Sequence, residues 1–528
     1  MRWLMLVLIA SVLMGGGPAL AQKPALGSVS FANSGAAAAQ APFLRGLALL
    51  HNFEYGDAAK AFREAEGIDP GFAMAFWGEA MTYNHAVWME QDADAARAAL
   101  TRLAPTPQAR AALARTPREA AYLHAVETLY GAGSKADRDF RYADEMAEIH
   151  RRFPTDIDAT AFYALSLLGT AHQGRDFTIY MRSAAILEAV FPEHKDHPGV
   201  LHYLIHSYDD PVHAPLGMRA ASLYGALAPN AGHALHMTSH IFVALGLWDE
   251  VIDANQQAMR VVQAREAGSG KPTPGCGHYA EWLVYANLQE GRLAEADRWI
   301  GLCRTEALGQ LAGETVQPAL EPRRSFVASY AEMLARRAVD TGRWTGGEAL
   351  PLAPGAHLTT RFNLAYGEAM GSMGDRARLS RLAPEIVKLR QDLAAAHPPH
   401  GAEAASPEDR WQDIMANQVV AADQMAQGRT AEGLAMLRGL NQREADAPIE
   451  FGPPAAYKPS AELLADGLLA EGEAGQAVEL YKLALSRTPG RSRAMQGLLK
   501  AQRALGDPAG AAVTEAALAR YPRPVAVE

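Results

Sequence analysis

Apolar residues recur at helical spacing along most of the chain, and prolines or glycines divide them into short segments. In one segment Ala58, Phe62 and Ala65 are three or four residues apart, so they lie on one face of a helix, which ends before Pro70. The segment that ends at Pro489 repeats this order of small and aromatic residues. No stretch of useful length alternates apolar and polar residues as a half-buried strand does. The pattern predicts an all-α fold made of paired helices.

Histidines are concentrated in one part of this pattern. Residues 197–242 contain seven of the 17 histidines. His202 and His206 are four residues apart, as are His236 and His240, so each pair projects from one face of a helix. Each member of the second pair follows its counterpart by 34 residues (236 − 202 and 240 − 206). The two pairs are therefore expected to occupy equivalent positions in successive structural units.

A spacing of 34 residues is the period of tetratricopeptide repeats, and the chain resembles that superfamily. The likeness is clearest in residues 43–70, 198–262, 278–305 and 458–522. The stretches HPGVLHYLIHSYDDP and HALHMTSHIF also resemble a group of exported bacterial repeat proteins, and this narrower likeness implies no activity. The resemblance implies a TPR-like helical-hairpin solenoid whose first helices line a concave groove. It further implies that the two histidine pairs face this groove and that a peptide, protein or small molecule binds there.

The chain is predicted to contain six segments. They are a signal peptide (1–21), a flexible leader (22–40), an N-terminal TPR-like array with the histidine-rich repeats (41–266), a loop (267–277), middle helical repeats (278–450) and a C-terminal TPR pair (451–528). The leader is predicted from its alanine, serine and glycine content and its lack of periodicity.

The N-terminus has the features of a secretory signal. Arg2 precedes an apolar run from Leu4 to Met14, and small residues end at Ala21. This order predicts cleavage after Ala21 and a periplasmic or secreted protein. The apolar run is too short to span a bilayer, and no other run reaches the required length of about 18 residues, so no transmembrane segment is expected.

The charge balance narrows the range of partners. The formal net charge is −10, and no cluster of basic residues stands out. An acidic surface without basic clusters repels phosphate backbones and anionic lipids. Nucleic acid is therefore not an expected partner.

The two cysteines are Cys276 and Cys303. In the repeat interpretation, one precedes the first helix of a hairpin and the other lies near the end of its second helix, so the two come close together. An oxidising compartment then favours a disulfide, and two unpaired buried thiols are the alternative.

Metal binding is the chemistry that the histidine pattern indicates. Neutral imidazole binds copper, iron and zinc, and a pair four residues apart can hold one ion from a single helix. The candidate ligands are His202, His206, His236, His240, His233, His213 and Asp209, with Asp210 nearby in sequence. Tyr203 and Met237 stand where a zincin would carry its catalytic glutamate, so that route to hydrolysis is disfavoured.

A second set of candidates lies nearer the N-terminus. His51 and His85 are also 34 residues apart (85 − 51), although sequence alone does not place them near the central histidines. The secondary metal candidates are His51, His85, His172, Glu54 and Glu79.

Two functions remain open at this point. One is an exported repeat protein with a polyhistidine transition-metal site, which serves oxidative chemistry or metal handling. The other is a metal-free periplasmic scaffold that binds peptides or envelope proteins, with the histidines as packing residues. The sequence assigns no catalytic residue to either function.

Overall fold

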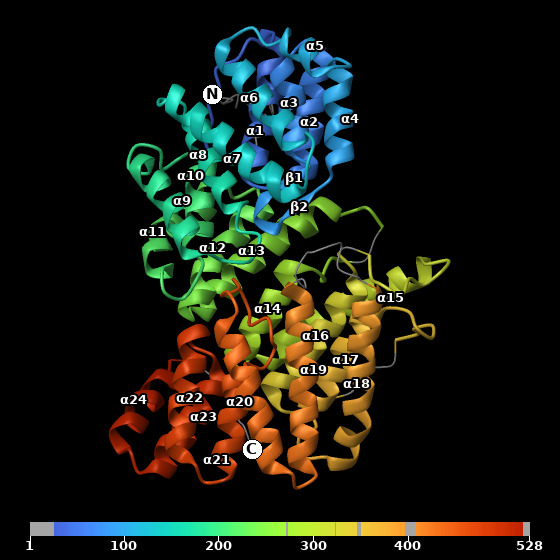
Figure 1. The fold of residues 1–528 in the computed structure, drawn as a ribbon, viewed down its shortest axis with the longest axis vertical. Helices are drawn as coiled ribbons and strands as arrows, with labels where there is room; N and C mark the ends of the chain where they lie inside the picture. Colours follow the sequence, from blue (N-terminus) through green and yellow to red (C-terminus); the bar gives the residue numbers. More distant parts are fainter. Residues whose placement is uncertain (1–25, 271–272, 323, 346–349, 397–406, 521–528) are drawn as a thin grey trace, which may run out of the picture.

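The structure, a computed structural model, describes residues 26–270, 273–322, 324–345, 350–396 and 407–520. The predicted signal peptide and its cleavage site therefore lie outside the described residues. The described chain is an all-α solenoid in which consecutive helices pack side by side as antiparallel hairpins (Figure 1).

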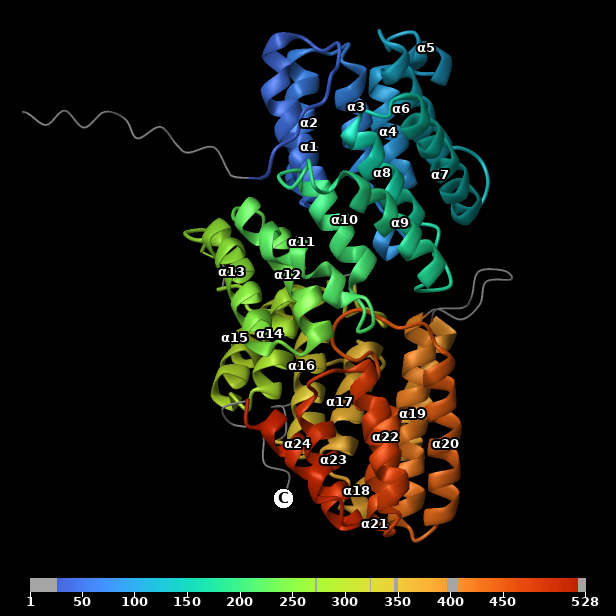
Figure 2. The ribbon, with the colours of Figure 1, turned by 90° about the vertical axis from the view of Figure 1, so that its left-hand side faces the viewer.

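The first half of the array contains thirteen described α-helices, with α1 to α9 at the top of Figure 2. These are α1 (Gln40–His51), α2 (Tyr55–Ile68), α3 (Ala73–Met81), α4 (Ala93–Leu103), α5 (Pro107–Ala111), α6 (Pro117–Leu129), α7 (Lys135–Arg152), α8 (Ile157–Leu168), α9 (Phe177–Val190), α10 (Pro198–Tyr208), α11 (Ala214–Leu227), α12 (Gly232–Leu245) and α13 (Trp248–Glu266). The 3-10 helix η1 (Ala37–Ala39) precedes α1.

The second half continues the array below the first in both views. Its described helices are α14 (His278–Gln289), α15 (Leu293–Gly313), α16 (Phe326–Thr341), α17 (Leu358–Met370), α18 (Arg376–Ala396), α19 (Pro407–Ala426), α20 (Thr430–Asp446), α21 (Ser460–Ala470), α22 (Ala474–Arg487), α23 (Ser492–Leu505) and α24 (Pro508–Leu518). Each helix packs mainly on its neighbours in sequence, so the core runs continuously through the array as expected for a solenoid.

The repeat motif acts through the fit of an aromatic ring against small residues. Phe62 is fully buried, and a Cβ atom added to Gly46 or Gly78 would lie within 2.9 Å and 2.4 Å of its ring. The absence of a side chain at these two glycines lets α1 and α3 approach α2 closely. The periodicity that predicted the hairpin thus reflects a direct steric requirement.

A short hairpin interrupts the helices within residues 72–88, an apolar stretch that by itself predicts one continuous helix beginning just after Pro70. Helix α3 ends at Met81, and β1 (Asn84–His85) pairs antiparallel with β2 (Glu90–Gln91) around the 3-10 helix η2 (Ala86–Trp88). Met89 adopts a left-handed φ of 53°, which closes the turn. The apolar stretch therefore extends to Trp88, although the helix itself ends at Met81.

Residues 26–39 pack onto the array. Leu26 and Phe31 are buried, and the Asn52 side chain donates a hydrogen bond to the Leu26 carbonyl. The Phe31 ring stacks on Trp77 with 5.6 Å between ring centroids. The described part of the predicted leader is therefore anchored by its few apolar residues, unlike the flexible segment that its composition indicated.

The C-terminal helices return to the middle of the array. Arg491, just before α23, forms ion pairs with Glu462 of α21 and Asp340 of α16. The Ser492 backbone N–H donates to Gln289 of α14, and the Trp248 indole N–H donates to the Gly490 carbonyl. These contacts hold the segment from α21 to α23 against α13, α14 and α16 (Figure 2).

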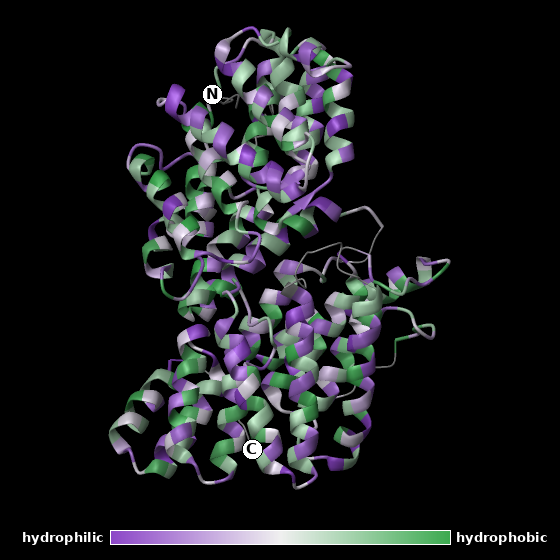
Figure 3. Cartoon of the chain, viewed as in Figure 1, coloured by the Kyte–Doolittle hydropathy of each residue, from purple (hydrophilic) through white to green (hydrophobic). Residues whose placement is uncertain are grey.

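The predicted bridge between Cys276 and Cys303 is present as a disulfide, with 4.4 Å between the two Cα atoms. It ties the segment before α14 to the middle of α15. Among the described residues, no helix is both long and apolar enough to cross a membrane. Most helices carry hydrophobic and hydrophilic faces, as Figure 3 shows.

Candidate metal centre

Two buried helices carry most of the central histidines. Helix α10 begins with Pro198 at its first turn, and the His197 ring nitrogen Nδ1 accepts a hydrogen bond from the Val200 N–H, which caps the helix. Every residue of α10 is buried, and α12 is buried on nearly all sides. A helix buried all round turns its polar side chains toward other protein groups, so its histidines need partners within the protein.

Three imidazoles form a first triad, composed of His202, His206 and His233. One ligand nitrogen from each lies within 4.8 Å of the others, and the three residues are 0%, 1% and 7% exposed. The Nε2 atoms of all three are buried without a hydrogen-bond partner among the described residues. Buried polar atoms without partners are uncommon. These three are imidazole nitrogens, which can coordinate a metal ion.

Hydrogen bonds fix the orientation of two of these rings. His202 donates from Nδ1 to the His51 carbonyl oxygen at 2.7 Å, and His206 donates from Nδ1 to Asp209 Oδ2 at 3.3 Å. In a neutral imidazole that donates from Nδ1, Nε2 carries a free lone pair. The free lone pairs of His202 and His206 are therefore on their Nε2 atoms, which have no hydrogen-bond partner among the described residues.

A second triad consists of His236, His240 and His278. Its ligand nitrogens again lie within 4.8 Å of one another, and His278 lies on the exposed side. His236 donates from Nδ1 to Asn255 Oδ1 at 2.6 Å, and His240 donates from Nδ1 to Asp209 Oδ2 at 3.0 Å. The two Nε2 atoms face each other at 3.1 Å.

Asp209 connects the two triads. Its Oδ2 atom accepts from His206 of the first triad and from His240 of the second, and its Oδ1 atom pairs with the buried Arg175. Burial alone would raise the pKa of Asp209, but Arg175 and the two imidazole donors lower it well below its usual range. Asp209 is therefore an ionised carboxylate that orients one histidine of each triad, the role of a hydrogen-bonded partner behind a ligand.

Burial keeps the imidazoles neutral. It lowers the pKa values of His202, His233 and His236 well below 6.5, and neighbouring imidazoles lower them further. The pKa of His240 is also lowered by burial, although Asp209 opposes the shift. Neutral rings at physiological pH have the lone pairs that metal coordination requires.

Aromatic side chains enclose the triads. The Phe53 ring lies 4.2 Å from the His202 ring and 5.5 Å from the His233 ring, centroid to centroid. Phe53 adopts a left-handed φ of 54°, which is uncommon for a bulky residue and concentrates in functional regions. On the other side Phe451, from the connector before α21, lies 5.1 Å from His240.

The close approach of this connector depends on the residue that follows Phe451. A Cβ atom at Gly452 would come within 2.5 Å of the Trp282 ring, and Gly452 has a left-handed φ of 88°. Of the two predicted histidine pairs, all four residues are at most 2% exposed. They therefore lie inside the protein, whereas the resemblance implied that they line an open concave groove.

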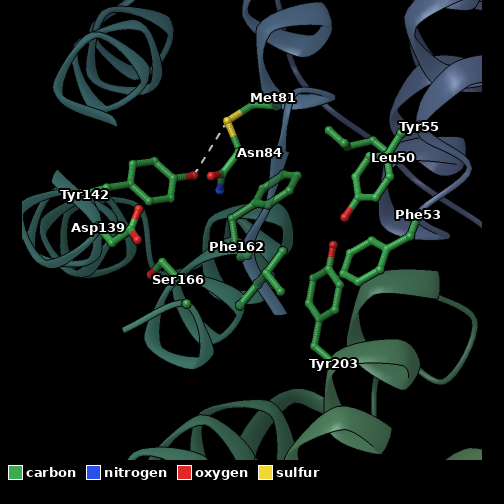
Figure 4. A pocket seen from close by; sticks show the side chains of 13 residues that line it. Leu50, Phe53, Tyr55, Met81, Asn84, Asp139, Tyr142, Phe162, Ser166 and Tyr203 are labelled. Atoms are coloured by element: carbon green, nitrogen blue, oxygen red, sulfur yellow. Dashed lines mark hydrogen bonds between the residues drawn. The ribbon is translucent and has the colours of Figure 1, made fainter. Parts of the chain in front are cut away.

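A pocket adjoins the first triad beyond Phe53 (Figure 4). The space between its lining side chains is small, with room for about one water molecule. The hydroxyl groups of Tyr55 and Tyr203 point toward each other inside it. Phe53 contributes to both the pocket wall and the triad wall, so the two spaces are neighbours.

The remaining predicted ligands lie apart from the two triads. His213 pairs with Asp210 at 2.9 Å and packs edge-on against Phe177. His85 lies in β1, stacked on Tyr55 and within 3.5 Å of Glu90. His172 is 3.3 Å from Asp139.

The two predicted glutamates have structural partners. Glu54 accepts from the His233 backbone N–H, which holds the start of α12, and also pairs with Arg265. Glu79 pairs with Arg63 and Arg102, far from the histidine triads in sequence.

His51 belongs to a separate hydrogen-bonded group. Its Nε2 atom donates to Asp158 Oδ1 at 2.9 Å, His197 donates to the same oxygen at 3.3 Å, and the Tyr203 hydroxyl donates to His51 Nδ1. Every ring nitrogen of His51 is thus engaged. This group supports the first triad through the His51 carbonyl, and its own nitrogens are not free for an ion.

Several residues of the site are absent from the sequence-based candidates. They are His278, Asn255 and Arg175. Arg175 lies 34 residues before its partner Asp209, but His278 and Asn255 do not follow this spacing. His278 follows the loop at 267–277, which interrupts the repeat register. No signal in the sequence alone links it to His236.

Comparisons with known proteins add little to this geometry. No protein-family model matches the chain, and no curated protein matches it. Among solved structures, the APC/C hetero-tetramer Cut9–Hcn1 is similar over 94% of this chain and 76% of its own, with 11% identity and a TM-score of 0.36. The TPR domain of P58(IPK) is similar over 90% of this chain and 99% of its own, with 14% identity and a TM-score of 0.23. The helical-hairpin architecture therefore rests on the helices described above.

Proposed function

We propose that the protein is an exported metal-binding protein whose buried triad of His202, His206 and His233 holds a transition-metal ion. The observation that carries this proposal is the group of three buried Nε2 atoms without partners, at His202, His206 and His233. All-imidazole ligation suits copper, iron or zinc. The oriented Nδ1 hydrogen bonds of two of these rings are the support that metal-binding histidines ordinarily have.

Metal analysis tests the proposal. The full chain is produced in a host with a periplasm, purified from that compartment without a histidine tag, and assayed by elemental mass spectrometry. We expect a stoichiometric transition metal whose content falls by the equivalent held at this triad in His202→Ala and His233→Ala and stays unchanged in His124→Ala, a change at an exposed histidine. A wild-type protein that is metal-free, and that takes up no copper, iron or zinc on titration, would favour the metal-free scaffold that binds peptides or envelope proteins.

Export is tested in the same preparation. The sequence supports removal of residues 1–21, and a disulfide between Cys276 and Cys303 suits an oxidising compartment. We expect the intact mass to correspond to a chain that begins at Gln22 with both cysteines oxidised. Retention of the N-terminal segment, or recovery from the cytoplasm alone, would contradict export.

Three protein ligands leave coordination positions open, which is typical of catalytic rather than closed structural sites. We therefore extend the proposal to metal-dependent chemistry, oxidative where the ion is redox-active. Oxygen uptake by the copper- or iron-loaded protein with small reductants tests this extension. Uptake that disappears in His233→Ala supports it, whereas uptake no faster than that of the free ion leaves metal storage or delivery.

A further inference from the structure

We infer that His236, His240 and His278 form a second metal site, distinct from the buried triad and open to solvent. This inference rests on the proposed function, because it assumes that the imidazole cluster binds transition-metal ions. It assigns a second ion to the protein and a ligand, His278, that lies outside the repeat register.

The protonation pattern of the triad follows from its hydrogen bonds. The Asn255 Nδ2 group donates to the Val251 carbonyl at 2.9 Å, so its Oδ1 faces His236 and accepts from Nδ1. The Asp209 carboxylate likewise accepts from His240 Nδ1. Both neutral rings therefore present unprotonated Nε2 atoms to each other.

Two facing lone pairs at 3.1 Å repel unless a cation lies between them. A tetrahedral ion with Zn–N bonds of about 2.05 Å would hold two nitrogens roughly 3.3 Å apart. The observed spacing is close to this value. His236 and His240 are four residues apart on α12, which is the spacing at which one helix chelates an ion.

His278 supplies the third ligand from a different element. It is the first residue of α14, its ring lies 4.6 Å from the His236 ring, and it is exposed, whereas His236 and His240 are buried. The disulfide at Cys276 anchors the chain two residues earlier. The second triad therefore has one face in contact with solvent, and an ion held there exchanges without passing through the buried triad.

Asp209 couples the two sites. One carboxylate oxygen accepts from His206 and from His240, so the same negative charge stabilises an ion at either triad. Two nearby cations also repel each other. We expect the two ions to bind in separate steps, with the buried triad tighter.

His206, Asp209 and His240 also lie close enough together to share an ion, but they are not an additional ion site. Asp209 Oδ2 already accepts from both rings, and Arg175 neutralises the other oxygen. It is the link between the triads.

Titration of the apo protein with Zn²⁺, and separately with Cu²⁺, tests the inference. We expect two equivalents in the wild type, one in His278→Ala, one in His233→Ala and none in the double variant. Chelator removal of the ions should be biphasic in the wild type and should lose its fast phase in His278→Ala. His278→Asn provides a second variant at this exposed position, and His124→Ala is the matched control.

The outcomes separate the two proposals. No binding at all, or binding unaffected by His233→Ala, overturns the proposed function. One equivalent in the wild type with both ions, or two equivalents retained in His278→Ala and His278→Asn, overturns the second site and leaves the first intact.

The coupling has its own test. Asp209→Asn should weaken both binding steps by about 10- to 100-fold, the usual effect of losing the partner behind a metal ligand. Asp210→Asn is the matched control, because Asp210 also pairs with Arg175 but contacts neither triad. Equal effects of the two substitutions on both steps would overturn the coupling.

Discussion

The array buries two polar clusters that differ in how their groups are satisfied. In the second half, Arg491 and Lys458 face Glu462 and Asp340, with N–O distances from 2.6 to 3.2 Å. Two cations thus match two carboxylates. At the histidine cluster, which α10, α12 and α14 form, the triads present imidazole nitrogens that face one another and receive no hydrogen bond from a donor. A cluster whose charges are balanced internally holds the solenoid together, whereas a cluster with unused lone pairs has capacity for an ion.

The largest expected effect comes from breaking the charge-balanced cluster. Arg491→Met leaves Glu462 and Asp340 buried without their main partner, which typically costs about 3–5 kcal/mol. Denaturant unfolding should report this loss while the metal content stays unchanged. Arg503→Met, at an exposed ion pair with Glu515, serves as control and should cost at most about 1 kcal/mol. Equal losses in the two variants would contradict a structural role for the cluster.

Removal of the disulfide should affect both the stability of the fold and metal binding at the second triad. Its 27-residue separation corresponds to about 3 kcal/mol in the chain-entropy account. A Cys276→Ser/Cys303→Ser variant should lose stability by about this amount in denaturant unfolding. Because Cys276 precedes His278 by two residues, this variant should also bind its second zinc equivalent more weakly than the wild type does. If the weakening falls on the buried triad instead, the assignment of His278 is wrong.

Metal should stabilise the protein most when the first triad is intact. An ion at 100 times its Kd adds about 2.7 kcal/mol to the free energy of unfolding. We expect thermal unfolding to shift upward on metal addition in the wild type and His124→Ala. In His202→Ala the shift attributable to the buried triad should be absent. Equal shifts in all three proteins would indicate binding elsewhere.

Acidification should distinguish the clusters in the apo protein. Burial lowers the pKa of His51 to about 4, so its neutral form favours the folded state above pH 6.5 and that contribution is lost between pH 6.5 and 4. Burial alone would raise the pKa of Glu462, but Arg491 and Lys458 lower it to about 2. Its contribution is present above pH 4.5 and is lost only as the pH falls toward 2. Hydrogen exchange should therefore rise in α1 and α10 before α21; the reverse order would contradict these assignments.

The smallest expected effect is that of replacing His213, which the sequence pattern includes among the ligands and the structure does not. His213 falls within the histidine-rich stretch, but it pairs with Asp210 outside both triads. His213→Ala should therefore leave both zinc equivalents and their affinities unchanged within a factor of about two, since second-sphere effects require direct contact with a ligand. Loss of an equivalent in calorimetric titration would return His213 to the ligand set.

The periodicity of the sequence predicted the helical hairpins and the two histidine pairs. It did not predict the contacts between segments that lie outside the repeat pattern. The spacing of Ala58, Phe62 and Ala65 follows from packing between neighbouring helices, so the sequence alone indicates the hairpins. The 34-residue offset similarly relates the pairs on α10 and α12. Both are local properties of a repeating chain, which is why they are visible without a structure.

The division into two triads depends on contacts between distant segments. His233 joins the first triad through the start of α12, and His278 joins the second across the loop at 267–277. Arg175, Asn255 and the His51 carbonyl support the rings from three other elements. The burial of the cluster depends on Phe451 from the second half of the chain. Apart from the 34 residues between Arg175 and its partner Asp209, these contacts have no repeating sequence spacing.

X-ray absorption at the metal edge of the protein as isolated tests the central claim most directly. We predict a first coordination shell with imidazole nitrogens at about 2.0–2.1 Å and the multiple-scattering pattern of histidine rings, lost in His202→Ala/His233→Ala/His278→Ala. A shell of oxygen ligands alone, or the same spectrum in the triple variant, would contradict a metal centre built from these two triads.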